Sequence, residues 1–237
     1  MTVRLAAWSG PRNISTALMR SWENRPDTVV VDEPFYAAYL THTGLPHPAR
    51  DEVLASQPCE PDDVIAALLA PTSAPVQYSK QMTHHVRLDL DLGWLAALRH
   101  VVIIRDPAEV VASYVRSREA CEPDDIGLLQ QQRLVEVLPA DTPVIDAADF
   151  LRAPGGYLRW LCGWLDLDFT EEMLRWPAGR RDSDGVWAPH WYAAVERSTG
   201  FEPYRRREPD LTEHDRAVAE ACRPAYDALR GRRLILG

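Results

Sequence analysis

Long apolar runs are missing from this sequence of 237 residues, although 46% of its residues are hydrophobic. No run approaches the roughly 20 residues that a membrane-spanning helix requires, and we expect no secretory leader before the first apolar segment. Internal repeats and low-complexity stretches are also missing. We therefore expect one cytoplasmic domain covering residues 1–237, with no membrane partner.

Cysteine and lysine are scarce, and the scarcity of each limits the kinds of site that we expect in this protein. The four cysteines form no paired motif, so we expect reduced thiols and no metal site. One of the 26 basic residues is a lysine, Lys80, and all the others are arginines. We expect Lys80 to lie where a compact point charge is required, with a chance surface position as the alternative. The net charge of −9 offers no general surface for nucleic acid.

Strand-like and helix-like segments alternate along the chain. Apolar, strand-like runs occur at 3–8, 28–31, 75–79, 100–104 and 142–146. Helix-like stretches occur at 15–24, 61–70, 88–99, 107–119, 124–138, 153–165 and 211–230. The alternation predicts a three-layer α/β fold with a mostly parallel sheet of about five strands covered by helices, and a ligand crevice at the carboxyl ends of the strands. We expect a loop or lid at 43–61 and a helical C-terminal part at 187–237.

Residues 3–16 carry the strongest functional signal. An apolar strand ends in a turn of small residues, and a helix begins directly after it. The free N–H groups and the positive dipole end of such a helix attract anions, and Arg12 adds a cation within the loop. An ordinary polar-capped connection between strand and helix is the alternative. The predicted phosphate or sulfate site comprises Gly10, Pro11, Arg12, Asn13, Ile14, Ser15 and Thr16.

This loop differs from the loop of nucleoside-triphosphate-binding proteins. That motif ends in Gly-Lys-Ser/Thr, where the lysine contacts the phosphates and the hydroxyl binds magnesium. The same spacing from Gly10 gives Ser15, Thr16 and Ala17, so both the lysine and the metal-binding hydroxyl are missing. We therefore expect a site without a metal, in which Arg12 supplies the positive charge.

A second anion site is expected after the fourth strand. Asp106 and Pro107 form a helix start, with the aspartate as N-cap and the proline as first helical residue. Ser113 lies about two turns into this helix and can share a face with Arg105. An arginine and a serine spaced in this way suit a second phosphate, and an ion pair between Arg105 and Asp106 is the alternative.

Three segments in this order resemble the sulfotransferases that use 3′-phosphoadenosine 5′-phosphosulfate (PAPS). Residues 10–16 are similar to their 5′-phosphosulfate loop, and Arg105 with Ser113 to their 3′-phosphate motif. Residues 180–187 are similar to a segment, Arg-Lys-Gly-x-x-Gly-x-Trp, that closes over the nucleotide, with Asp182 in place of the first glycine. The resemblance implies a P-loop fold and transfer of a sulfuryl group from PAPS to a hydroxyl or amine of a small-molecule acceptor. It also implies nucleotide contacts by Arg180, Arg181, Gly185 and Trp187.

Two residues depart from the family pattern within the first loop. Ile14 replaces the usual glycine, and a side chain makes left-handed backbone costly at that position. Ala17 stands where many family members have a tryptophan that stacks on adenine, so adenine recognition is expected from elsewhere or to be weak. Arg12 and the loop amides, supported by the Thr16 hydroxyl, are expected to hold the 5′-phosphosulfate.

Two sets of residues are candidates for the catalytic step. Glu33 follows the second strand, where the resemblance to bacterial sulfotransferases implies a glutamate that takes the acceptor proton. Asp32 is the alternative carboxylate, and apolar neighbours would raise the pKa of the base toward working pH. Lys80, His84 and His85 resemble a Lys-Thr-His segment in which a histidine is the base and the lysine steadies the sulfate.

Two other functions stay open. A phosphotransferase of the nucleotide-kinase type would require magnesium and a loop lysine. A nucleotide-binding protein that kept the fold and lost the chemistry would tolerate Ile14, Ala17 and Asp182. The acceptor cannot be read from the sequence, because tryptophans at helical spacing, such as Trp160 and Trp164, predict core packing. A homodimer is also left open.

Overall fold

A parallel sheet of five strands forms the centre of the computed structural model, which describes residues 2–116, 121–206 and 209–236. The strand order is β2-β3-β1-β4-β5, and every neighbouring pair runs parallel. The strands are β1 Val3–Ser9, β2 Thr28–Asp32, β3 Val76–Met82, β4 Arg99–Ile104 and β5 Val144–Asp146. Each lies on an apolar run of the sequence, so the expected parallel sheet is confirmed.

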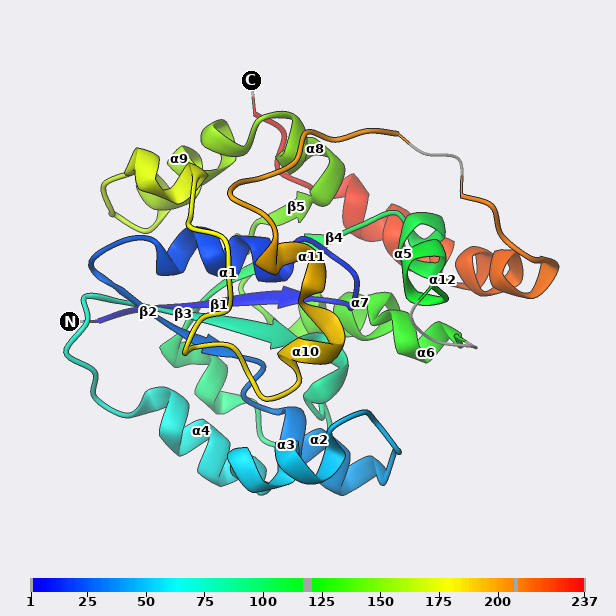
Figure 1. The fold of residues 1–237 in the computed structure, drawn as a ribbon, viewed down its shortest axis with the longest axis horizontal. Helices are drawn as coiled ribbons and strands as arrows, with labels where there is room; N and C mark the ends of the chain where they lie inside the picture. The colour runs from blue at the N-terminus through cyan, green and yellow to red at the C-terminus, as the bar shows by residue number, and fades with distance from the viewer. Residues whose placement is uncertain (1, 117–120, 207–208, 237) are drawn as a thin grey trace.

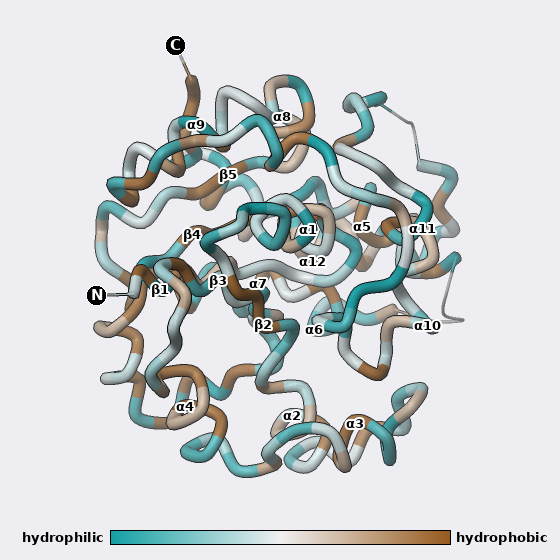
Figure 2. The backbone as a smooth tube through the Cα atoms, turned by 60° about the vertical axis from the view of Figure 1, so that its left-hand side comes forward, coloured by the Kyte–Doolittle hydropathy of each residue, from teal (hydrophilic) through white to brown (hydrophobic). Residues whose placement is uncertain are grey.

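Helices cover both faces of this sheet (Figure 1). Because side chains alternate along a strand, β1 contributes Leu5 and Ala7 to one core and Ala6 and Trp8 to the other. The first core includes α1 Ser15–Glu23, α8 Ala147–Arg152 and α9 Pro154–Trp164; the second includes α4 Pro61–Leu69, α7 Leu128–Val137 and α12 Glu213–Gly231. Figure 2 shows hydrophobic stretches along the interior strands and hydrophilic stretches on the outside. The three-layer α/β prediction is therefore confirmed.

Capping residues explain where several helices begin. The Asp106 carboxylate accepts a hydrogen bond from the backbone N–H of Ala108 (2.9 Å) at the start of α5, and Thr212 caps α12 in the same way. The remaining helices are α2 Tyr36–Thr43, α3 Arg50–Ser56, α5 Pro107–Tyr114, α6 Pro123–Ile126, α10 Ala188–Trp191 and α11 Ala193–Glu196, with 3₁₀ turns η1 Thr83–His85, η2 Gly93–Ala97 and η3 Glu171–Leu174.

The helix expected at 88–99 is wrong. Only the short turn η2 forms there, and Arg99 already belongs to β4. The Asp91 carboxylate accepts a hydrogen bond from the backbone N–H of Gly93 (2.8 Å), which competes with a regular helical turn. Within the described residues, no helix is both long and apolar enough to cross a membrane.

Three further segments differ from their expected boundaries. The expected helix at 124–138 is divided at Gly127, whose φ of 78° ends α6 and begins α7. The expected loop at 43–61 contains α3, because Val53 is fully buried in the core beneath it. The expected helix at 107–119 ends at Tyr114, and its last three residues lie outside the described part of the chain.

Candidate active site

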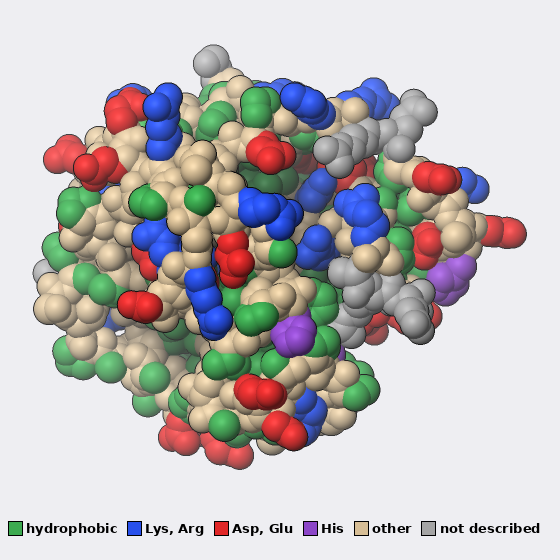
Figure 3. Space-filling view, viewed as in Figure 1, with side chains coloured by type: hydrophobic (Ala, Val, Ile, Leu, Met, Phe, Trp, Pro, Cys, Tyr) green, Lys and Arg blue, Asp and Glu red, His purple; other side chains and the backbone are tan. Residues whose placement is uncertain are grey.

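A cavity of about 390 Å³ opens at the carboxyl ends of the strands, where an α/β sheet binds its ligands. It lies between the N-terminus of α1, helix α5 and the α10–α11 segment. Figure 3 shows basic side chains gathered on this face, over the region between α11 and α5. Of the predicted site residues, the cavity brings together Pro11, Arg12, Asn13, Ile14, Ser15, Thr16, Glu33, Lys80, His84, His85, Arg105 and Ser113.

The loop between β1 and α1 forms one wall of this cavity. Arg12 has a positive φ of 54°, whereas Ile14, where the usual glycine is replaced, has a φ of −84°. The left-handed residue of the loop is thus Arg12, and Ile14 carries no backbone strain. Asn13 fixes the loop, since its Nδ2 donates to the Ile103 carbonyl (3.0 Å) and its Oδ1 accepts from the Ile14 N–H (2.8 Å). No side chain of the described residues caps α1, and Ser15, Thr16 and Ala17 of its first turn line the cavity, as an anion site would require.

Gly10 does not line the cavity, but its missing side chain shapes the loop. A Cβ atom at this position would lie 2.2 Å from the carbonyl oxygen of Ile126. Gly127 approaches from the other side, where a Cβ atom would lie 3.0 Å from the Gly10 Cα. The loop therefore packs directly against the break between α6 and α7, where Gly10 leaves no space for a side chain.

Three arginines gather beside the loop. Arg12 Nε donates to Ser113 Oγ (3.0 Å), and Arg105 Nη1 donates to the Arg12 carbonyl (2.7 Å). Burial and the positive charges of Arg116 and Arg105 lower the pKa of Arg12. Mutual repulsion among cations in a partly buried site is relieved by a bound anion, so the cluster is suited to a phosphate or sulfate.

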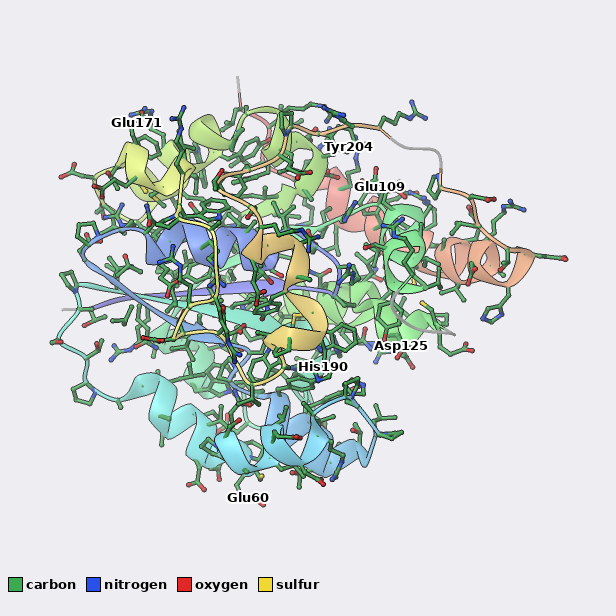
Figure 4. The ribbon with its side chains drawn as sticks, in the orientation of Figure 1. Glu60, Glu109, Asp125, Glu171, His190 and Tyr204 are labelled. Carbon is green, nitrogen blue, oxygen red and sulfur yellow. The ribbon has the colours of Figure 1, made fainter. Side chains whose placement is uncertain are left out.

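Glu109 is the counter-charge of this arginine cluster. Arg105 Nε donates to its Oε2 (3.0 Å), and the Tyr204 hydroxyl donates to its Oε1 (2.8 Å). Figure 4 labels Glu109 and Tyr204 in neighbouring positions. The alternative pairing of Arg105 with Asp106 does not occur, because Asp106 pairs with Arg223 (2.8 Å) and caps α5.

A second polar cluster surrounds Lys80 at the other end of the cavity. Its ammonium donates to Asp32 Oδ1 (3.0 Å), Glu33 Oε1 (2.5 Å) and the hydroxyl of Tyr192 (2.5 Å). The register pairs Asp32 with Lys80 on neighbouring strands. Lys80 is 2% exposed, so the single lysine does not lie at a chance surface position. It is a buried point charge, as expected.

Opposing electrostatic effects act on this cluster. Burial raises the pKa of Glu33, Lys80 lowers it and Asp32 raises it again, and the net effect is a raised pKa. Burial disfavours the charge of Lys80, but the adjacent Asp32 and Glu33 outweigh burial and raise the pKa of Lys80. Lys80 is thus a stable cation beside a carboxylate of enhanced basicity, which is the requirement for a general base.

The two histidines lie beside this cluster in an aromatic stack. The ring of His85 stacks on Tyr36 and on Tyr39, with 4.6 Å between ring centroids in each pair, and His84 packs edge-on against it. His85 Nδ1 lies 3.9 Å from Glu33 Oε2. Burial, with the neighbouring imidazoles, lowers the pKa of His85 far below its usual value, so the ring is neutral. Glu33, unlike His85, contacts the lysine directly.

The third motif lies behind the Lys80 cluster rather than on the cavity wall. Arg180, Arg181, Gly185 and Trp187 are all described, and none lines the cavity. Asp184 accepts a hydrogen bond from Arg20 (2.6 Å) in a fully buried ion pair. The Gly185 N–H then donates to Asp32 Oδ2 (3.1 Å). In this structure the motif supports a carboxylate of the site.

Sequence reasoning missed Tyr192 and Glu109 as members of the site. No motif marks Tyr192, which reaches Asp32 from 160 positions away in the chain. Glu109 lies four residues after Arg105, the spacing of a helical ion pair, and that spacing was the available signal. Among the tryptophans, Trp191 lines the cavity, while Trp160 and Trp164 stack on each other elsewhere.

Comparisons with known proteins found a matching family model and curated relatives. A family model described as a sulfotransferase domain matches residues 3–233. Branched-chain-amino-acid aminotransferase-like proteins 2 and 1 of Arabidopsis thaliana are 35% and 37% identical to the chain over 234 residues, covering 94% of the chain and 41% of each relative. The chain therefore spans about two fifths of the length of these curated relatives.

Solved sulfotransferase domains share the fold. The domain from the Curacin biosynthetic pathway superposes with a TM-score of 0.59 at 15% identity, covering 93% of this chain and 97% of that one. The domain from the Synechococcus PCC 7002 olefin synthase gives 0.59 at 17%, with 93% and 94% covered. A sulfotransferase from Alicyclobacillus acidocaldarius gives 0.57 at 13%, with 99% and 98% covered.

Proposed function

The chain belongs to the sulfotransferase domain family, and on that premise we propose that it moves a sulfuryl group from PAPS to a hydroxyl or amine of a small-molecule acceptor. One observation carries the proposal: an anion site and a basic carboxylate share a single cavity. The arginine cluster suits the donor, and the Lys80 cluster suits the acceptor. A cytoplasmic location remains a prediction beside it, and a homodimer stays open.

The donor requires two anion subsites, and the cavity offers residues for both. Arg12, the N–H groups at the start of α1 and the Thr16 hydroxyl would hold the 5′-phosphosulfate. Arg105 and Ser113, already linked to the loop by hydrogen bonds, would hold the 3′-phosphate. The partly buried cations of this cluster repel one another, which is the observation that fits a doubly anionic ligand.

The transfer step balances with the residues present. The bond between sulfur and the bridging phosphate oxygen breaks, a bond between sulfur and the acceptor oxygen or nitrogen forms, and Glu33 takes the acceptor proton. Adenosine 3′,5′-bisphosphate leaves with the bond electrons. Lys80 holds the Glu33 carboxylate at 2.5 Å and keeps a fixed positive charge next to the reacting groups.

Calorimetric titration with adenosine 3′,5′-bisphosphate, without magnesium, tests the donor site before any acceptor is known. Selective binding supports the proposal, and binding of ATP with magnesium alone would favour a phosphotransferase. Binding of neither would favour a protein that kept the fold and lost the chemistry. Arg12→Ala should weaken bisphosphate binding at least about tenfold, because it removes a charged hydrogen-bond donor. Arg87→Ala is the control, since Arg87 pairs with Asp89 on the surface and does not line the cavity.

A further inference from the structure

Tyr192 is held rigidly at the junction of α10 and α11. Its backbone N–H donates to the Ala188 carbonyl (2.8 Å), and its own carbonyl accepts from the Glu196 N–H (2.9 Å). The side chain is 3% exposed and lines the cavity. The indole N–H of Trp187 donates to the Tyr192 hydroxyl (3.2 Å). The phenol oxygen therefore has a fixed place beside the Lys80 cluster.

The partners of this hydroxyl determine where its proton points. Lys80 Nζ lies 2.5 Å away and the Trp187 Nε1 lies 3.2 Å away, and both groups can only donate. They occupy the two lone pairs of the phenol oxygen, so its single proton must go to a carboxylate. Asp32 lies at 2.7 Å and 2.8 Å, whereas Glu33 Oε1 lies at 3.4 Å. The phenol thus donates to Asp32.

This direction makes two adjacent carboxylates unequal. Asp32 accepts from the Tyr192 hydroxyl, from Lys80 (3.0 Å) and from the backbone N–H of Gly185 (3.1 Å). Among the described residues, Glu33 has one close donor, Lys80, and its other oxygen lies 3.9 Å from the His85 ring. Hydrogen bonds to a carboxylate stabilise its ionised form, so Asp32 is stabilised as an anion more strongly than Glu33.

We propose that Tyr192 is a positioning residue that assigns these carboxylates their roles, holding Asp32 as a fixed anion and leaving Glu33 to take up the proton. The inference deepens the proposed function and rests on it in one respect: the proton that Glu33 takes up comes from the acceptor. The test of the inference requires no acceptor. The groups facing Glu33 are Lys80 from β3, Asp32 from β2, the Tyr192 phenol and the neutral His85 ring. Burial, with Asp32 next to it, raises the pKa of Tyr192 well above its usual value, so the phenol keeps its proton.

The single lysine makes this arrangement measurable without an acceptor. Labelling all lysine side chains with ¹³C gives one side-chain resonance set, from Lys80, whose shift follows the charge of the carboxylates in contact with it. The unaltered protein should show one carboxylate titration step above the ordinary glutamate range. Glu33→Gln should abolish this step and thereby assign it.

Two variants should move the step in opposite directions. Tyr192→Phe removes a donor from the carboxylate pair, so the step should move to higher pH. Asp32→Asn removes the anion next to Glu33 and leaves Lys80 to pair with it alone, so the step should move to lower pH. Tyr226→Phe is the matched control, because its phenol also donates to a buried aspartate, at 2.6 Å, outside the cavity.

An unchanged step in Tyr192→Phe, or an equal shift in Tyr226→Phe, would overturn the proposal. So would a step that moves to higher pH in Asp32→Asn, because the proposal requires Asp32 to be an anion that opposes ionisation of Glu33. Titration with adenosine 3′,5′-bisphosphate separates this result from the proposed function. Opposite shifts without bisphosphate binding would refute the donor assignment only, and binding without the shifts would refute the role of Tyr192 only.

Discussion

Replacing the single lysine by methionine should destabilise this protein in a way that depends strongly on pH. Lys80→Met keeps most of the buried volume and removes the cation between Asp32 and Glu33. Both carboxylates then remain in a site where the lysine is only 2% exposed. Removing one partner of a buried ion pair costs about 3–5 kcal/mol, so a loss of this size in the free energy of unfolding is expected at about pH 8.

The loss should shrink as the pH falls. Without the ammonium, burial and mutual repulsion raise the folded-state pKa of the two carboxylates above their unfolded values. The folded variant then binds protons more readily than the unfolded chain, so its stability rises as the pH falls through the raised folded-state pKa. The raised pKa of Lys80 stabilises the unaltered protein fully below the unfolded lysine pKa of about 10.4. Between about pH 5 and pH 8 the change therefore comes from the carboxylates.

Urea unfolding of the variant and of the unaltered protein, compared once at about pH 5 and once at about pH 8, measures this difference in the free energy of unfolding. Arg87→Met is the control, because Arg87 pairs with Asp89 on the surface (2.6 Å), where an ion pair contributes about 0–1 kcal/mol. Adding Asp32→Asn to Lys80→Met should restore part of the stability at the higher pH. Equal losses at both pH values, or a loss no larger than in the control, would refute the reasoning.

Two further substitutions test the anion site. Gly10→Ala should destabilise the loop and weaken bisphosphate binding, because the new Cβ would lie 2.2 Å from the Ile126 carbonyl oxygen. Gly163→Ala is its control: a Cβ there has nothing within 4 Å, so the substitution should raise the midpoint of thermal unfolding. Glu109→Gln removes the carboxylate that pairs with Arg105 at 3.0 Å, so it should tighten binding of adenosine 3′,5′-bisphosphate several-fold in calorimetry and leave AMP binding unchanged. Tighter AMP binding as well would show that Glu109 acts on the whole cluster and not on the 3′-phosphate.

The strands and the first loop could be predicted because short-range patterns determine them. Apolar, β-branched runs bounded by turn residues marked all five strands, and the turn after the first strand marked the helix start at Ser15. The failed helix at 88–99 shows the limit of the same method. A carboxylate that bonds to the backbone two residues later, as Asp91 does, decides against a helix that the apolar spacing favours.

The Lys80 cluster could be predicted only in part because its contacts are distant in sequence. The sequence marked Glu33, its neighbour Asp32 and the single lysine as unusual. It gave no sign of Tyr192, which joins the cluster from 160 positions away. The motif at residues 180–187 also shows that a sequence match does not determine what a residue contacts. The Gly185 N–H donates to the Asp32 carboxylate, and Gly185 does not line the cavity.

Backbone strain explains how two consecutive carboxylates reach the same lysine. Successive side chains of a strand point to opposite faces, so Asp32 and its neighbour would normally diverge. Glu33, the first residue after β2, has a positive φ of 42°, a conformation that costs a non-glycine residue free energy. With this turn its carboxylate contacts the same ammonium as Asp32 does. Arg12, with a φ of 54°, meets the same cost at the anion site. In both places unfavourable backbone serves to aim a charged side chain into the cavity, as is common at functional sites.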